Sequence, residues 1–232
     1  MTGFMNQISK ESTLELRLPL SFLQRPANSA GTRPWLLVLM HGVGSNERDL
    51  FGLTAHVPPN FHVLSLRAPH VLGPGSYAWF EFGITPGGER RIDEAQELAS
   101  RQLVAQTVAS AAQQLDVPPE RVVVGGFSQG GIMSLSLLLT QPQLLRGAMV
   151  LHSRLLPQVL PLIAPPEQLE GKQLWVSHGL QDQVIALASA RDIRERVSRL
   201  PLTLSYTEYP GGHAIMAAEL DAAMNWLRAM TV

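Results

Sequence analysis

The sequence contains no cysteine. This absence excludes disulfides, a thiol nucleophile and thiolate metal ligands, although it leaves the cellular compartment undetermined. Charged residues are scarce as well, at 16% of the chain, and they nearly cancel to a formal net charge of -1. A charge so close to zero gives no electrostatic basis for binding nucleic acid or an anionic membrane surface, so we expect neither as a partner.

Long apolar runs are also missing, since none approaches the ~20 residues that a membrane-spanning helix needs. The opening stretch MTGFMNQISKESTLEL has no basic segment followed by an apolar one, so it does not have the pattern of a secretory signal. We therefore expect a cytoplasmic protein without stable membrane insertion. The pattern H-E-x-x-H is absent too, and no histidine has metal-ligand spacing to a partner, so we expect no metal and no cofactor.

Apolar residues make up 45% of the 232 positions. This is enough for a large core, and we expect one domain over residues 1–232. Apolar runs that favour strands alternate with patterns that favour helices, which predicts an α/β fold with a mostly parallel sheet and helices on both faces. The expected strands are 14–20 (an edge strand, from alternating leucines), 35–40, 61–66, 122–124, 147–151, 173–176 and 202–209. The expected helices begin near 47 and cover 93–116, 132–139, 185–200 and 214–230.

Polar side chains with chemical potential follow these strands directly. Ligands of parallel sheets bind at the carboxyl ends of strands, so residues at these positions are expected to converge on one site. The residues that stand there are His41, Ser128, His152, Asp182 and His213.

The segment RVVVGGFSQGG holds a G-x-S-x-G pattern centred on Ser128. A buried strand precedes it and an apolar helix follows it, which is the context of a nucleophile elbow. Gly126 and Gly130 permit the tight turn that would lift the serine hydroxyl clear of the sheet. The alternative is a glycine-rich turn that carries an ordinary surface serine.

A serine nucleophile needs a base, and the base needs a carboxylate to orient it, in the chain order serine, acid, histidine. Asp182 follows a strand and precedes the last histidine, His213, so we assign these two as acid and base. Asp192 lies in a predicted helix and Glu208 within a predicted strand, which makes both poorer candidates for the acid. A loop-capping aspartate and a surface histidine are the corresponding alternatives.

An oxyanion hole in such a site takes one backbone N–H from the residue after the nucleophile and one from the loop after an upstream strand. These would be the N–H groups of Gln129 and Val43. His41 and His178 each begin a His-Gly pair at a strand end, and we expect both to shape the loops that carry Val43 and Asp182 rather than to act as the base.

The segment 73–88 contains five glycines and two prolines, and aromatic side chains are interspersed among them. We expect an irregular loop that is too short for a helical lid. Trp79, Phe80 and Phe82 would offer an apolar wall to an acyl chain of short to medium length. The alternative is that these rings fill the core.

The motifs HGVGSNERDL, RAPH, WFEF, GFSQGG, HGLQDQVI and YPGGH, in this order, resemble the phospholipase/carboxylesterase family of α/β-hydrolases, which includes acyl-protein thioesterases. The resemblance runs from about residue 35 to the C-terminus. It implies the triad Ser128, Asp182 and His213, the oxyanion donors Val43 and Gln129, and an aromatic pair near the acyl site at Trp79 and Phe80. One departure is His152-Ser153, where the family usually has Ser-Gly. An imidazole at position 152 would narrow the substrate pocket. The candidate pocket residues are Trp79, Phe80, His152 and Ile185.

The sequence thus predicts a serine carboxylesterase or thioesterase that hydrolyses short- to medium-chain acyl esters through an acyl-enzyme. Lysophospholipase and acyl-protein thioesterase activity are specific forms that this activity could take. A peptidase or amidase of the same fold is a rival, as is a binding protein that uses an inactive hydrolase pocket. Whether the chain forms a homodimer is left open.

Overall fold

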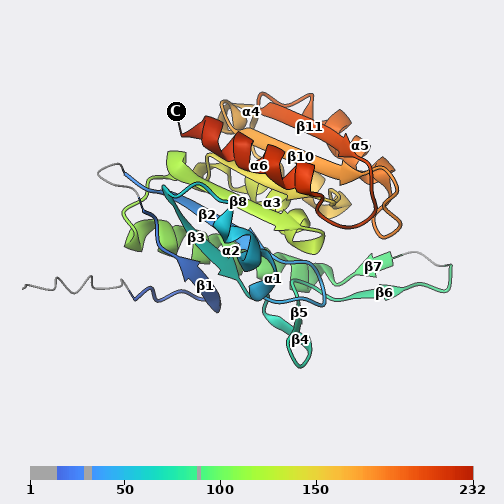
Figure 1. Cartoon of the computed structure of the whole chain (residues 1–232). Helices are drawn as coiled ribbons and strands as arrows, with labels where there is room; N and C mark the ends of the chain where they lie inside the picture. Colours follow the sequence, from blue (N-terminus) through green and yellow to red (C-terminus); the bar gives the residue numbers. More distant parts are fainter. Residues whose placement is uncertain (1–14, 29–32, 88–89, 232) are drawn as a thin grey trace, which may run out of the picture.

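A seven-stranded sheet forms the centre of the computed structural model, which describes residues 15–28, 33–87 and 90–231 (Figure 1). The strand order is β1-β3-β2-β8-β9-β10-β11. All neighbouring strands run parallel except β1, which pairs antiparallel with β3. The strand bounds are β1 Phe22–Arg25, β2 Trp35–Met40, β3 Phe61–Leu66, β8 Val122–Phe127, β9 Gly147–Leu151, β10 Gln173–Gly179 and β11 Thr203–Tyr209.

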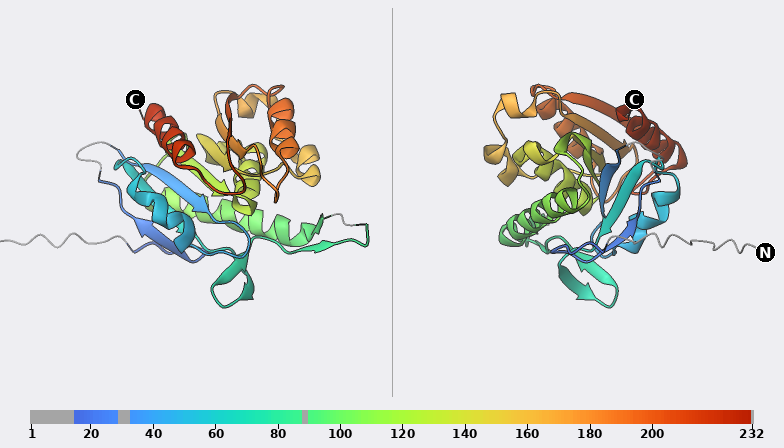
Figure 2. Two further views of the ribbon diagram at one scale, coloured as in Figure 1. Left: turned by 45° about the vertical axis from the view of Figure 1, so that its right-hand side comes forward. Right: turned by 90° about the vertical axis from the view of Figure 1, so that its left-hand side faces the viewer.

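Helices cover both faces of this sheet, as Figures 1 and 2 show from three directions. One face packs against α1 (Arg48–Phe51) and α6 (Ala217–Met230), and the other against α2 (Glu94–Gln114), α3 (Gln129–Thr140) and α5 (Leu187–Val197). Shorter helical pieces are α4 (Pro166–Leu169) and the 3-10 turns Gly52–Ala55, Pro119–Arg121, Pro142–Leu144 and Pro157–Leu162. The predicted fold class, a mostly parallel sheet between helices, is confirmed.

The central strands are buried on both sides because each faces a helical layer. Every residue of β2, β3 and β9 is buried, which explains why β2 and β9 read as continuous apolar runs rather than as alternating ones. Helix α2 begins at a cap that the sequence provides, since the Asp93 carboxylate accepts the Gln96 N–H at 2.9 Å. The chain leaves α2 through Asp116, whose φ of 52° is left-handed.

Two segments differ from the sequence-based expectation. The expected edge strand at 14–20 is wrong: residues 15–20 are not strand, residue 14 lies outside the described residues, and the edge strand is Phe22–Arg25. The leucine alternation reflects burial rather than strand pairing. Leu16 and Leu20 are buried against the core, although the segment that carries them forms no strand. The expected irregular loop also contains strands, in the hairpins β4 (His70–Gly73) with β5 (Ser76–Ala78) and β6 (Phe82–Ile84) with β7 (Arg90–Ile92).

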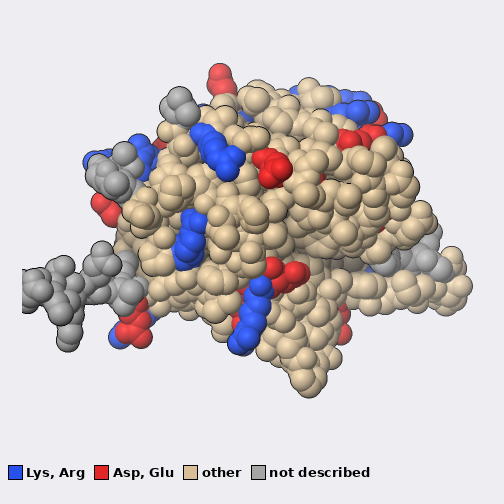
Figure 3. All heavy atoms as spheres, viewed as in Figure 1, with Lys and Arg blue, Asp and Glu red and all other residues tan. Residues whose placement is uncertain are grey.

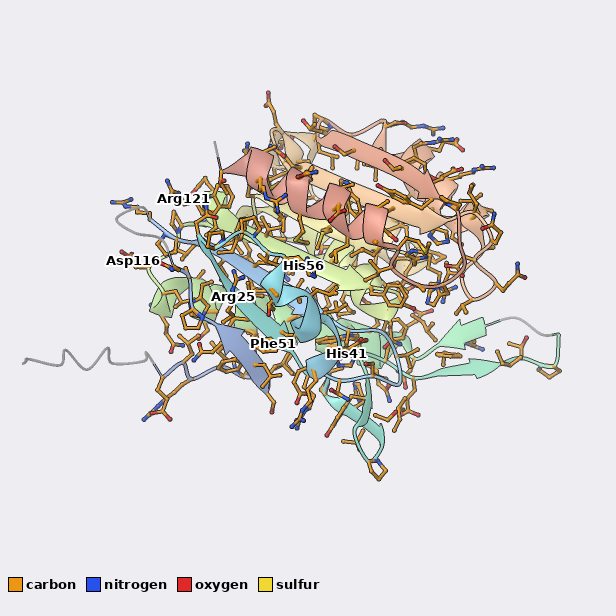
Figure 4. All side chains as sticks on the ribbon, in the orientation of Figure 1. Arg25, His41, Phe51, His56, Asp116 and Arg121 are labelled. Atoms are coloured by element: carbon orange, nitrogen blue, oxygen red, sulfur yellow. The ribbon has the colours of Figure 1, made fainter. Side chains whose placement is uncertain are left out.

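Arg25 on the edge strand holds the segment that carries α1. Its guanidinium donates to the carbonyl oxygens of four residues, Thr54, Val57, Pro58 and Phe61, at 2.5 to 2.9 Å. Figure 4 labels Arg25 together with Phe51 and His56, which lie on either side of the 3-10 turn that it anchors. Five N–H donors in a fixed planar fork suit this task, because several carbonyls can be satisfied at once. The anchored segment forms one wall of the cavity described below.

On the face of the molecule drawn in Figure 3, basic and acidic side chains lie singly or in mixed groups among uncharged surface. Within the described ranges, no helix combines the length and the hydropathy that crossing a bilayer would require.

Candidate active site

Ser128 lies at the end of β8, next to the point where the strand order changes direction. The chain moves from β2 to β3 on one side and then to β8 on the other, so β2 and β8 end side by side. Ser128 itself has φ 55° and ψ -116°, a strained conformation for a residue with a side chain, and α3 begins at the next residue. A Cβ on Gly126 would collide with the backbone of Gly130, and one on Gly130 with the carbonyl of Met40. The two glycines of the motif are therefore required by the turn.

A line of hydrogen bonds connects Ser128 to two residues from distant parts of the chain. The Ser128 Oγ lies 2.9 Å from His213 Nε2, and His213 Nδ1 lies 2.7 Å from Asp182 Oδ2. Asp182 follows β10 and His213 follows β11, so the parallel pairing of neighbouring strands brings the two loops together. The structure thus places the three predicted side chains in hydrogen-bonding order.

The carboxylate of Asp182 is held from both of its oxygens. Oδ1 accepts the backbone N–H groups of Val184 and Ile185 at 2.8 and 2.9 Å, while Oδ2 faces the Nδ1 atoms of His213 and His152. Burial alone would raise the pKa of Asp182, but these hydrogen bonds outweigh it and lower the pKa to about 2. Asp182 is therefore ionised and fixed in orientation at neutral pH.

The loop after β2 lies directly against Ser128. An added Cβ on Gly42 would sit 3.4 Å from the Cβ of Ser128, and Gly44, with φ 83°, lets the chain turn there. Val43 is at the tip of this turn and is 38% exposed. His41 supports the turn: Ala68 N–H donates to its Nε2 at 3.1 Å, and its Nδ1 bonds the Gly42 carbonyl at 2.7 Å. Figure 4 labels His41 just beyond β2, and its contacts match the structural role expected for it.

Gln129 uses its side chain to hold the aromatic segment. Its Oε1 accepts the Trp79 N–H at 2.7 Å and its Nε2 donates to the Phe80 carbonyl at 2.6 Å. The Trp79 ring donates in turn from Nε1 to the His41 carbonyl at 2.9 Å. Trp79 is 0% and Phe80 2% exposed, so the expectation that they form the wall of an open acyl site is wrong for this structure. The segment turns the rings of Trp79 and Phe80 inward, where burial of large aromatic surface is favourable. Phe82 is 39% exposed and does not line the cavity beside His213.

His213 lines an open cavity of about 330 Å³. Its walls come from the α1 segment, from the residue before the nucleophile and from the loop after the base. They are mainly apolar, with one carboxylate at Asp49. The lining residues are Asp49, Leu50, Leu53, Phe127, His213, Ala214 and Ile215.

His152 is not a pocket residue in this structure. Its side chain is 0% exposed, and its two ring nitrogens are each 3.1 Å from a carboxylate oxygen, of Asp182 at Nδ1 and of Glu219 at Nε2. The expectation that it narrows the pocket is corrected, because a strand-end residue with φ 49° turns its side chain into the protein. Ile185 is also buried and does not line the cavity beside His213. It acts through its backbone, which bonds Asp182 and His178.

His178 shapes the Asp182 loop, as expected, because its Nε2 bonds the Ile185 carbonyl at 2.8 Å. Burial lowers the pKa of His178, and the neighbouring His152 and His213 lower it further. His178, His152 and Asp182 each offer a ligand atom within 4.8 Å of the others. The described hydrogen bonds use both ring nitrogens of His152, both oxygens of Asp182 and Nε2 of His178, and they leave Nδ1 of His178 without a partner in the described part of the chain.

Two polar residues beside the site were missed in the sequence. Glu219 is fully buried in the first turn of α6, and Ser177 donates to its Oε1 at 2.5 Å. Glu219 also accepts the Met216 N–H at 3.1 Å. The available signal was a glutamate in the third position of the final helix, a position at which glutamate commonly caps helices. That signal points to a cap and gives no indication of His152 as a partner.

Comparison with known proteins assigns the chain to a family. The family model described as Phospholipase/Carboxylesterase matches residues 27–231, nearly the whole chain. The chain belongs to this family of carboxylic ester hydrolases, which has the α/β-hydrolase fold, and the resemblance noted in the sequence is confirmed.

Individual relatives agree with the family match. Acyl-protein thioesterase 1 of Neurospora crassa is 32% identical over 162 residues, covering 66% of this chain and 64% of the relative, slightly less than two thirds of its length. The putative hydrolase MhqD of Bacillus subtilis is 26% identical over 198 residues, covering 85% and 94%. The crystal structure of the Bacillus cereus carboxylesterase superposes with a TM-score of 0.76 at 23% identity, covering 91% and 94%. This last likeness concerns the fold alone.

Proposed function

We propose that the protein is a serine carboxylesterase or thioesterase that hydrolyses short- to medium-chain acyl substrates through an acyl-enzyme on Ser128. The observation that carries this proposal is the unbroken series of hydrogen bonds from Ser128 Oγ through His213 to Asp182. A serine hydroxyl becomes an effective nucleophile only when an oriented base takes its proton, and this arrangement supplies both the base and its orientation.

In the first half of the reaction, Ser128 Oγ bonds to the carbonyl carbon of the substrate as its proton passes to His213 Nε2. The tetrahedral intermediate then breaks its bond to the leaving oxygen or sulfur, which takes the proton from His213. In the second half, water attacks the acyl carbon and gives a proton to His213. The acid leaves, and the proton returns to Ser128 Oγ. Asp182 stays ionised throughout, which its low pKa favours.

The negative oxygen of the intermediate would be bound by the backbone N–H groups of Gln129 and Val43. Gln129 is the first residue of α3, where an N–H has no partner within the helix and the helix dipole is positive. Val43 is at the tip of a turn that lies against Ser128. These positions support the two as donors.

The acyl chain is assigned to the cavity beside His213, in place of the aromatic segment. Leu50, Leu53, Phe127 and Ile215 make most of its wall apolar, and its volume of about 330 Å³ has room for an acyl chain of short to medium length. The thioesterase name of the N. crassa relative favours thioesters as alternative substrates.

Labelling by a fluorophosphonate tests this proposal, because the reagent forms a phosphorus–oxygen bond with an activated serine and releases fluoride. We expect the wild-type protein to be labelled and to hydrolyse p-nitrophenyl butyrate, and Ser128→Ala to do neither. Ser134→Ala is the matched control, since Ser134 is a buried serine on α3 whose hydroxyl donates to the Gly130 carbonyl. Labelling of the Ser128→Ala protein would place the nucleophile on another residue, and no labelling of the wild type would support the rival binding protein.

A further inference from the structure

His152 lies behind Asp182, on the side opposite His213, and its surroundings are unusual for a histidine. The ring is fully buried, and each of its nitrogens faces the oxygen of a different carboxylate. Nδ1 is 3.1 Å from Asp182 Oδ2, and Nε2 is 3.1 Å from Glu219 Oε2. A neutral imidazole has one N–H and one lone pair, so it could donate to only one of these two carboxylates.

The carboxylate of Glu219 accepts hydrogen bonds on both of its oxygens. It receives the Ser177 hydroxyl on Oε1 and the Met216 N–H on Oε2, in addition to the contact with His152. Asp182 likewise receives two backbone N–H groups and His213. Donors therefore surround both carboxylates, and a lone pair of His152 directed at either would be the one repulsive contact in the group. A proton on both nitrogens of His152 removes it.

We propose that His152 is a positioning residue that remains an imidazolium between Asp182 and Glu219, and that its charge moderates the pull of Asp182 on the proton of His213. This inference rests on the proposed function, because it concerns the same three residues. The family resemblance gives no basis for it, since the family usually has serine where this chain has His152.

The electrostatics agree with the geometry. Burial lowers the pKa of His152, but the hydrogen bonds and charges of Glu219 and Asp182 outweigh it, so that the pKa is raised. The titratable groups that face the ring are Asp182 from the loop after β10, Glu219 from α6, His178 from β10 and His213 from the loop after β11. His178 stacks on the ring at 5.3 Å between centroids, and the pKa of Tyr209 is raised by burial and by the charge of Glu219.

The consequence for catalysis follows from the sharing of one oxygen. Asp182 Oδ2 faces both His213 at 2.7 Å and His152 at 3.1 Å, and the two rings are 5.7 Å apart. A positive charge on His152 makes a second positive charge on His213 less favourable. Through this repulsion, the charge on His152 should extend the activity of the enzyme to lower pH.

The pH profile of kcat/KM for p-nitrophenyl butyrate tests this consequence. Removing the positive charge in His152→Gln should move the acid limb of the profile upward by about one pH unit. It should also change kcat more than KM, because the surroundings of Asp182 and His213 change while the cavity is untouched. The control is His62→Gln, which replaces a buried histidine on β3 whose partner is Gln24. Its acid limb should coincide with that of the wild type.

The charge on His152 is tested directly by ¹⁵N NMR of histidine-labelled protein. At pH about 8.5, where an ordinary imidazole is neutral, one of the seven histidine rings should carry protons on both nitrogens. Glu219→Gln should abolish that signal. Glutamine at this position keeps the bond to the Met216 N–H, so the helix cap survives and only the charge is lost. Glu208→Gln, which breaks a surface ion pair with Arg191, should leave the signal unchanged.

Each result has a fixed meaning. An unchanged acid limb in a folded His152→Gln protein, or the absence of a doubly protonated ring in the wild type, overturns the inference. If His152→Gln does not fold, the wild-type NMR spectrum decides alone. Failure of the proposed function is distinguishable, because it would appear as fluorophosphonate labelling that does not depend on Ser128.

Discussion

The Nε2 atom of His213 lies 2.9 Å from the Oγ atom of Ser128, although 85 positions separate the two residues in the chain. Ser128 follows β8 and His213 follows β11, and two strands lie between these in the sheet. The contact is possible because the loop after β11 is bonded to the loop after β10, through His213 to Asp182 and through Gly211 to Gln181. The geometry of this loop therefore determines whether the serine has a base.

Replacing Asp182 by asparagine should reduce kcat by something like 10⁴-fold. The amide would present a neutral partner and favour the wrong tautomer of His213. Asp192→Asn is the control, because Asp192 lies on the surface of α5 and pairs only with Arg196 among the contacts described. Steady-state kinetics on a p-nitrophenyl ester compares them. Equal losses in the two variants would mean that Asp182 is not the acid.

Filling the cavity beside His213 should shorten the preferred acyl chain. Each methylene buried there contributes about 0.8 kcal/mol, which corresponds to roughly a fourfold rise in kcat/KM when it is realised in the transition state. Leu53→Trp replaces a leucine of the cavity wall by the larger indole side chain. We expect this variant to lose the rise from acetyl to hexanoyl esters and to hydrolyse the acetyl ester at nearly the wild-type rate.

The control for this substitution is Leu72→Trp, on the exposed part of the β4–β5 hairpin away from the cavity. It should keep the wild-type dependence on acyl length. A chain-length series that is identical for Leu53→Trp and the wild type would remove the cavity from the substrate site.

Trp79→Ala should act on stability rather than on specificity. The ring is fully buried, and its Nε1–H bond to the His41 carbonyl fixes the start of the loop that carries Val43. Loss of so large a buried ring costs ~3–5 kcal/mol of unfolding free energy. Thermal or urea unfolding should show this loss, while the folded fraction keeps the wild-type dependence on acyl length. A flattened dependence with an unchanged unfolding midpoint would restore the aromatic pair to the acyl site.

Stability at low pH should depend on Asp182. Its pKa is about 2 in the folded protein, against an ordinary value of 3.8, because hydrogen bonds favour the ionised form. A carboxyl with a depressed folded pKa stabilises the fold above its unfolded pKa, and this contribution disappears as the pH falls from about 4 to about 2. The depression corresponds to ~2 kcal/mol.

Urea unfolding at a series of pH values between 5 and 2 measures this contribution. Asp182→Asn should lack that part of the pH dependence, whatever its absolute stability, and Asp192→Asn should retain it. Parallel curves for Asp182→Asn and the wild type would show that Asp182 titrates normally in the folded protein.

Much of the site could be predicted from the sequence because parallel strands bring their carboxyl ends to one edge. Knowing that Ser128, Asp182 and His213 follow strands was enough to expect that they meet, without any knowledge of the intervening loops. The glycines around Ser128 were informative for the same reason, since the tight turn depends on backbone sterics that are local in sequence.

The pocket could not be predicted in this way. Trp79 and Phe80 lie in a segment without periodicity, so nothing in the sequence indicates whether their rings face the solvent or the core. The cavity wall at Leu53 and Ile215 belongs to segments 162 residues apart, which meet only through packing on the sheet. Glu219 is recognisable as a helix cap, but its second role depends on the direction of one strained residue, His152.

The covalent intermediate gives the most direct test of the central claim. The protein is mixed with excess p-nitrophenyl butyrate, quenched in acid during turnover and analysed by mass spectrometry, both intact and after digestion. The account predicts a butyryl group on a fraction of the wild-type chains, on the peptide that contains Ser128 and on that residue, and no such mass in Ser128→Ala. Rapid hydrolysis with the acyl group on another residue, or hydrolysis that persists in Ser128→Ala, would contradict it.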